Sequence, residues 1–184
     1  MKTCLVAVAD GTEELEAVAV IDTLRRAGVQ VTVASVGGRQ VTCSRGVTLV
    51  ADALISACAQ QRFDAIVLPG GLPGAEHLRD SAELTDLLRR QHAEGRLLAA
   101  ICASPAVVLQ HHGLIGARHA TCYPGCEKTL ENADATGAAV VVDGPCITSR
   151  GPGTALPFAL ALVRGLCGEA SASKVAAGML TPAH

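Results

Sequence analysis

The sequence predicts an α/β fold in which residues 1–184 form a single domain, with helices on both faces of a mostly parallel sheet. Short apolar segments alternate with longer helical patterns along almost the whole chain, as strands joined by crossover helices do. The length of 184 residues fits one domain with a sizeable core. The apolar segment 97–101 stops at Cys102, directly before another helical pattern, and this is the position of a nucleophile at a strand-to-helix turn.

Each element of this fold follows from a local pattern. Apolar runs without a polar side predict buried strands at 3–9, 29–36, 63–68 and 97–101. Helical patterns are found at 13–27, 81–94, 103–112, 154–167 and 169–180. The segments 138–142 and 145–149 flank Asp143-Gly144 and predict a hairpin, and two short runs within 39–50 predict a second hairpin outside the main sheet.

The composition argues against nucleic-acid and membrane partners. One tyrosine, two phenylalanines and no tryptophan leave no aromatic platform on which bases would stack. A formal net charge of -2 gives no electrostatic attraction to nucleic acid or to an anionic membrane surface. The apolar segment 3–9 is too short to cross a bilayer and is followed by Asp10, so we expect it to be the first strand of a cytoplasmic protein.

One of the eight cysteines is placed for chemistry. Without a secretory signal, most of the eight are expected to be reduced thiols in the core. Cys102 differs because the small residues Ala100 and Ser104 lie two positions away on either side, as a tight nucleophile elbow requires. The N-terminus of the following helix favours a thiolate, so we expect Cys102 to have a lowered pKa and to be the most acidic and most oxidisable thiol. The alternative is a structural core cysteine.

Two other segments supply candidate partners for Cys102. Gly70 and Gly71 follow an expected strand and allow the backbone to approach a ligand, so the N–H groups of Gly71 and Ala103 are candidate oxyanion donors. Glu16 lies among apolar residues of the first expected helix, where burial favours a protonated carboxyl. A protonated Glu16 would donate a hydrogen bond to the Cys102 sulfur, and the two groups would titrate as a coupled pair.

Other polar residues have simpler explanations. Glu13 and Glu14 suit the first turn of a helix, where carboxylates complement the helix dipole. His119, Cys122 and Cys126 have spacing that suits a metal ion, but no fourth ligand is evident, so we expect no metal site. None of the six histidines lies in a catalytic motif that would supply a base.

Four motifs together resemble the ThiJ/PfpI superfamily, in the branch of the parkinsonism-associated deglycase and the bacterial protein YajL. The motifs are Glu13-Glu14-Leu15-Glu16, Leu68-Pro69-Gly70-Gly71, Ala100-Ile101-Cys102-Ala103 and Thr148-Ser149-Arg150-Gly151-Pro152-Gly153-Thr154. The segments 25–29 and 43–47 also resemble this branch. The resemblance covers nearly the whole chain, and the joint occurrence of the motifs is far more specific than any one of them.

The resemblance implies a flavodoxin-like three-layer sandwich that forms homodimers. It implies that Cys102 is the reactive cysteine of a nucleophile elbow and that a protonated Glu16 holds it. It also implies that Gly71 and Ala103 are the oxyanion donors and that Arg45 reaches toward the partner subunit's site. The implied activities are glyoxalase turnover without a cofactor, from methylglyoxal to lactate, repair of early glycation adducts, oxidative-stress sensing and chaperone action.

Two departures from the superfamily's patterns narrow the activity. The parkinsonism-associated protein has a histidine before a proline near its cysteine, whereas this chain has Tyr123-Pro124. A Cys–His dyad is therefore not expected, and Tyr123 is expected to line the pocket without acting as a base. Peptidases of the superfamily place a histidine where this chain has Ala103, and class I glutamine amidotransferases need a downstream His-x-Glu that this sequence lacks. Both activities are disfavoured.

Two functions remain open. In an enzyme, the Cys102 thiolate would attack the aldehyde of a 2-oxoaldehyde and Glu16 would move protons between the substrate carbons, before hydrolysis of a thioester. In a redox sensor with chaperone-like partners, Cys102 would oxidise to a sulfinate held by Glu16. The enzyme is the preferred interpretation. A Glu16→Gln variant is expected to keep the fold, to raise the thiol pKa modestly and to lose turnover.

Overall fold

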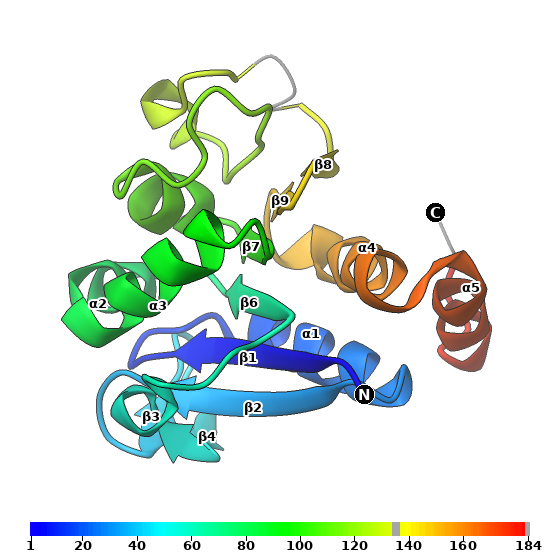
Figure 1. The fold of residues 1–184 in the computed structure, drawn as a ribbon, viewed down its shortest axis with the longest axis horizontal. Helices are drawn as coiled ribbons and strands as arrows, with labels where there is room; N and C mark the ends of the chain where they lie inside the picture. Colours follow the sequence, from blue (N-terminus) through cyan, green and yellow to red (C-terminus); the bar gives the residue numbers. More distant parts are fainter. Residues whose placement is uncertain (134–136, 183–184) are drawn as a thin grey trace.

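A seven-stranded sheet with the order β5-β2-β1-β6-β7-β9-β8 forms the centre of the molecule (Figure 1). The computed structural model describes residues 1–133 and 137–182. Neighbouring strands are parallel except for β8, which pairs antiparallel with β9, and β3 and β4 form a separate hairpin. The strands are β1 (Thr3–Val8), β2 (Gln30–Ser35), β3 (Gln40–Thr42), β4 (Thr48–Val50), β5 (Ala53–Leu54), β6 (Ala65–Leu68), β7 (Leu97–Ile101), β8 (Val140–Asp143) and β9 (Cys146–Ser149).

Helices cover both faces of this sheet. One face carries α1 (Glu14–Arg26) and α4 (Ala155–Cys167), and α5 (Glu169–Gly178) packs on α4. The other face carries α2 (Gly74–Asp80), α3 (Ala82–Ala93) and a π-helix, η2 (Pro105–Gln110), and in Figure 1 these lie on the opposite side from α4 and α5. The short 3-10 helices are η1 (Ile55–Cys58), η3 (Glu127–Thr129) and η4 (Pro152–Thr154). No helix in the described part of the chain is long and apolar enough to span a membrane.

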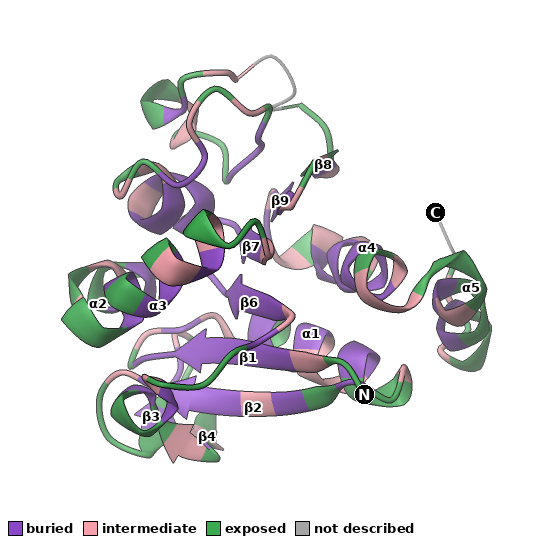
Figure 2. Cartoon of the chain, in the orientation of Figure 1, coloured by how far each residue is buried: buried purple, intermediate pink, exposed green. Residues whose placement is uncertain are grey.

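Alternate residues of the central strands enter two separate cores. In β1, Leu5 and Ala7 pack toward α2 and α3, whereas Cys4, Val6 and Val8 pack toward α1 and α4. All five side chains are fully buried, as is most of β6 and β7 (Figure 2). A strand covered on both faces has no polar side, which explains the uninterrupted apolar runs in the sequence. The expected flavodoxin-like three-layer sandwich is confirmed.

The segment after Cys102 differs from the expected helix 103–112. Its regular part is the π-helix η2, which is limited to Pro105–Gln110. Bonds of the α type flank it, from the Val107 N–H to the Ala103 carbonyl and from the His112 N–H to the Val108 carbonyl. In so short a segment, the spacing of apolar residues does not distinguish the i+4 hydrogen bonds of an α-helix from the i+5 hydrogen bonds of a π-helix. Short π-helical segments are common at functional sites.

Two short elements were not expected from the sequence. The seven-residue helix α2 and the two-residue strand β5 are too brief to show a period of their own. The hairpin of β3 and β4 lies outside the main sheet as expected. It is fastened to the loop after β1, because the Gly11 N–H donates to the Thr42 carbonyl and the Ser44 N–H donates to the Thr12 carbonyl, both at 2.8 Å.

Candidate active site

The strand order places a site at one edge of the sheet. From β1 the chain runs to β2 on one side, whereas β6 lies on the other side of β1, so the order reverses between β1 and β6. Ligand sites of open α/β sheets form at the carboxyl ends of the strands beside such a reversal. The loop after β1, the Pro69-Gly70-Gly71 segment after β6 and Cys102 after β7 all lie at this edge.

Cys102 has the backbone geometry of a nucleophile elbow. Its φ of 64° lies in the left-handed region, which residues other than glycine seldom adopt. The Cys102 N–H donates to the Ser149 carbonyl at 2.9 Å, and its own carbonyl accepts the Tyr123 N–H at 2.7 Å. The Ser104 hydroxyl donates to the Pro69 carbonyl at 2.5 Å. Bonds to three neighbouring segments therefore hold the strained turn in place.

Two glycines let the site close tightly. A Cβ atom on Gly70 would lie 2.5 Å from the Cβ of Cys102 and 3.0 Å from Oε2 of Glu16, so no other residue fits there. Gly71 has a φ of +88°, and a Cβ there would collide with the Gly11 carbonyl oxygen. The glycine-rich loop that is expected to approach a ligand packs closely against Cys102 and Glu16.

The carboxyl of Glu16 is completely buried beside this loop. Its Oε2 accepts the Gly70 N–H at 2.7 Å, and Oε1 has no hydrogen-bond partner within the described residues. Burial raises the pKa of Glu16 to about 7, against the opposing effects of the hydrogen bonds with Gly70 and Cys102. The sequence-based expectation that Glu16 points inward and is readily protonated agrees with this geometry.

The thiol of Cys102 does not have the low pKa expected from its position. Burial, followed by the charge of Glu16, raises the thiol pKa to about 12, although the N–H groups of Gly71 and Ala103 both donate to the sulfur and lower it. Burial also raises the pKa of Cys43, to about 11, and the rank of Cys102 among the eight thiols stays a prediction. The expectation of a lowered pKa is wrong because burial and a neighbouring carboxylate outweigh the backbone donors.

The effect of Glu16→Gln on the thiol pKa depends on whether Glu16 carries a proton, and it stays a prediction. The charge of Glu16 and its hydrogen bond both raise the pKa of Cys102, so a neutral amide removes the larger of these two effects. A thiolate at Cys102 is favoured only while Glu16 carries a proton. The two groups therefore act as a pair that shares its protons, with Cys102 itself only 9% exposed.

Tyr123 lies beside the elbow, as expected. Its N–H holds the Cys102 carbonyl, and a Cβ atom on Gly151 would lie 3.4 Å from the tyrosine ring. The side chain is 49% exposed, and its expected place in the wall of the site stays a prediction. Arg45 lies on the exposed hairpin turn, and its reach toward a partner subunit stays a prediction.

The first two glutamates of the 13–16 motif have roles that the sequence did not reveal. Glu13 caps α1 by accepting the Glu16 N–H at 2.8 Å. The Glu14 carboxylate accepts the Arg45 N–H at 2.9 Å and the Ser44 hydroxyl at 3.1 Å, which clamps the hairpin turn onto α1. The helix dipole alone does not account for these hydrogen bonds. The clamp depends on a contact between distant parts of the chain, which no local pattern signals.

The described residues contain no group of three or more histidine, cysteine or acidic side chains arranged to hold a metal ion, and His119, Cys122 and Cys126 are no exception.

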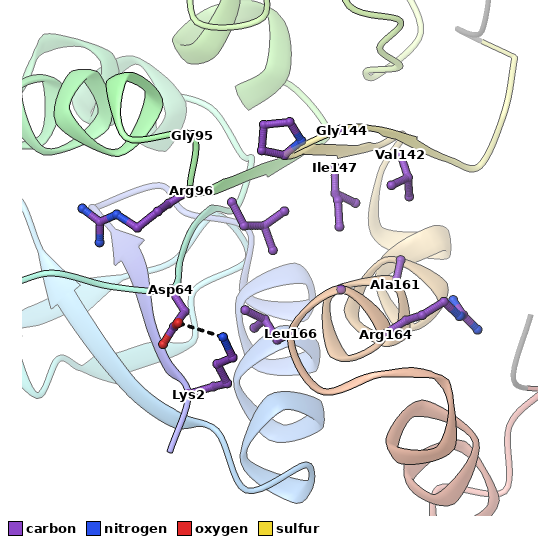
Figure 3. A pocket seen from close by; sticks show the side chains of 13 residues that line it. Lys2, Asp64, Gly95, Arg96, Val142, Gly144, Ile147, Ala161, Arg164 and Leu166 are labelled. Atoms are coloured by element: carbon purple, nitrogen blue, oxygen red, sulfur yellow. Dashed lines mark hydrogen bonds and ion pairs between the residues drawn. The ribbon is translucent and has the colours of Figure 1, made fainter.

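A separate hollow of about 440 Å³ lies at the opposite end of the sheet, beside the paired Lys2 and Asp64 (Figure 3). No cysteine or histidine lines it. Cys102 and the buried carboxyl of Glu16 instead lie together at the other end of the sheet.

Comparison with known proteins identifies the family. The sequence matches the DJ-1/PfpI family over residues 2–165. The chain belongs to this family. It is 44% identical to protein dj-1beta of Drosophila melanogaster over 97% of both chains, and 36% identical to glutathione-independent glyoxalase DJR-1.2 of Caenorhabditis elegans over 86% of this chain and 85% of that one. The structure of oxidized Toxoplasma gondii DJ-1 is 49% identical, with a TM-score of 0.95 over 98% of this chain and 99% of that one. The resemblance inferred from the motifs is confirmed.

The raised pKa of Glu16 makes stability depend on pH. A carboxyl whose pKa rises from 4.5 to about 7 on folding binds more protons when folded, so stability falls as pH rises through this window. The loss amounts to about 3 kcal/mol. The Glu16→Gln variant lacks this loss of stability. The free energy of unfolding of the variant minus that of wild type should therefore increase by about 3 kcal/mol between about pH 5 and about pH 8. Urea unfolding at both pH values measures it, and parallel pH profiles would contradict the assignment.

Proposed function

We propose that this protein is a cysteine-dependent glyoxalase that converts 2-oxoaldehydes such as methylglyoxal into 2-hydroxy acids. The observation that carries the proposal is the Cys102 sulfur, which receives the N–H groups of Gly71 and Ala103 and interacts with the buried carboxyl of Glu16. A nucleophile, two candidate oxyanion donors and an acid/base group thus meet at one point. A family member with 36% identity bears the name glutathione-independent glyoxalase, which supports this choice.

The proposed reaction needs no external electron acceptor, because the aldehyde carbon is oxidised while the neighbouring ketone carbon is reduced. The Cys102 thiol gives its proton to Glu16, and the sulfur attacks the aldehyde carbon to form a hemithioacetal. The N–H groups of Gly71 and Ala103 stabilise the oxyanion until Glu16 returns the proton to it. The Glu16 carboxylate then moves the hydrogen from this carbon to its neighbour through an enediol, which gives a thioester. Water hydrolyses the thioester, and the hydroxy acid and the free thiol are released.

The burial of the pair favours small substrates. Cys102 is 9% exposed and Glu16 is not exposed at all, so a free 2-oxoaldehyde reaches them more easily than an adduct on a folded protein. In our proposal, early glycation adducts decline because the free aldehyde is removed. A carboxyl with a pKa near 7 suits proton transfer in both directions at neutral pH. We assign the activity to cytoplasmic defence against carbonyl and oxidative stress.

Loss of either member of the pair should abolish turnover. Cys102→Ser and Glu16→Gln are each expected to lower lactate formation from methylglyoxal by about a hundredfold or more. Cys167→Ser, at the end of α4 and far along the chain from the site, is the matched cysteine control and should stay near wild type. Turnover close to wild type in Cys102→Ser would rule out the thiol as nucleophile.

Tyr123 is expected to shape the site without transferring a proton. A phenol has an ordinary pKa of about 10, which is poorly suited to proton abstraction at neutral pH. Tyr123→Phe should therefore change kcat by less than about tenfold, because it removes one hydroxyl and keeps the ring. Steady-state kinetics with methylglyoxal measures this. A loss as large as that in Cys102→Ser would instead make Tyr123 the base and remove Glu16 from that role.

A second candidate function is oxidation sensing at Cys102. The two N–H donors and the Glu16 carboxyl that surround the sulfur would also hold the oxygens of a sulfinate, and a family member has been solved in an oxidized form. Mild peroxide followed by peptide mass spectrometry should then find added oxygen at Cys102 before any other cysteine. Stoichiometric oxidation without measurable lactate formation would favour the sensor over the enzyme, and oxidation elsewhere first would contradict the sensor.

We infer that two copies of the chain associate through α1. Leu15, Val18 and Leu156 are 57%, 45% and 38% exposed, and they border one hollow of about 530 Å³. Arg45, clamped by Glu14 at the start of α1, is placed near this surface. An apolar surface of this kind marks an interaction site.

A charge in the middle of this surface should prevent association. Val18→Glu is expected to convert the dimer into a monomer, whereas Val142→Glu, on the exposed strand β8, should leave the mass unchanged. Light scattering at micromolar concentration measures both variants. A wild-type protein that is monomeric under these conditions would refute the inferred interface.

A further inference from the structure

Two cysteines of the turn that carries Tyr123 have no role in the site described above. The Cys122 thiol lies 3.6 Å from the Tyr123 carbonyl oxygen, and the Cys126 N–H donates to the same oxygen at 3.0 Å. Gly125, with a φ of +98°, supplies the left-handed residue that reverses the chain between them. The turn therefore folds both cysteines around one carbonyl group.

Cys122 and Cys126 also share one core, which is not the core of Cys102. Cys122 is fully buried on the sheet face that carries α2 and α3, and Cys126 packs against the same cluster while remaining partly exposed. Cys102 packs with the cluster on the face of α1 and α4. The charge of Cys126 contributes to the raised pKa of Cys122, an effect that requires the two thiols to be near each other.

We propose that Cys122 and Cys126 form a reversible internal disulfide on exposure to a peroxide, at a modification site separate from Cys102. The partly exposed Cys126 is oxidised first, to a sulfenic acid, and the peroxide releases water. The Cys122 sulfur then attacks the Cys126 sulfur, and a second water leaves. In sum, two thiols and one peroxide give one disulfide and two waters, and a small dithiol reverses the reaction by exchange.

The position of the turn connects this disulfide to the nucleophile elbow. Tyr123 lies between the two cysteines, and its N–H holds the Cys102 carbonyl at 2.7 Å. A bond between Cys122 and Cys126 closes a small ring around Tyr123, so the segment that supports the elbow becomes covalently fixed. Disulfides in reducing compartments are transient and act in sensing or catalysis, and this assignment fits that use.

Trypsin offers a direct test on the full-length protein. Cleavage after Arg118 and Lys128 releases one peptide, 119–128, that contains both cysteines and no other. The native protein is treated with hydrogen peroxide at neutral pH and at about pH 8, because burial and Glu127 raise the pKa of Cys126 and slow its oxidation at neutral pH. Free thiols are then alkylated and the peptides are weighed. We expect this peptide to lose two hydrogen atoms and both alkylation sites, and to regain them after treatment with dithiothreitol.

Three variants make the result decisive. The disulfide peptide should form undiminished in Cys102→Ser and should be absent in both Cys122→Ser and Cys126→Ser. A peptide that remains fully alkylated even at peroxide doses well above the dose that fully oxidises Cys102 would overturn the proposal, as would a cross-link between Cys122 and Cys102. Methylglyoxal turnover does not enter the measurement, so its outcome is independent of the proposed glyoxalase activity.

Discussion

The burial of a single carboxyl determines the chemistry of this site. Glu16 accepts the Gly70 N–H and interacts with the thiol of Cys102 in a place that water does not reach. The cost of burying its charge raises its pKa to about 7, and the same charge raises the pKa of the thiol. Because Gly70 has no side chain, Glu16 and Cys102 can both pack against the backbone at this position. The charge of Glu16 therefore opposes a thiolate at Cys102, whereas the N–H groups of Gly71 and Ala103 favour one.

The sequence predicts the layers of the fold and the tight strand-to-helix turn at Cys102, because both depend on local patterns. Strands buried on both faces appear as apolar runs, and Cys102 follows one of them directly. The sequence places Glu16 beside Cys102, but it does not predict the raised pKa of the thiol, since it does not reveal how deeply the turn is buried. It also misses the clamp formed by Glu14, which joins α1 to a hairpin some thirty residues later.

Three glutamates in one turn show how partners determine the role of a side chain. Glu13 caps the helix, Glu14 holds the Arg45 turn and Glu16 enters the core beside Cys102. The three residues have the same chemistry and lie within one turn of the chain. Their functions differ because the first two meet backbone N–H groups near the surface, whereas the third is enclosed between α1 and the sheet. The first turn of α1 thus holds the β3–β4 hairpin through Glu14 and places Glu16 beside Cys102.

The margins of the sheet limit main-chain pairing with other molecules. The outer strands are short, with two residues in β5 and four in β8. Beyond β5, Asp52 takes over the edge of β2, where its side chain accepts the Val33 N–H at 2.9 Å. A charged residue on a sheet margin, together with brief outer strands, discourages main-chain pairing between molecules. The apolar interior strands are thereby shielded from amyloid-like stacking, which leaves the association that we infer between two copies to side chains on the helical surface.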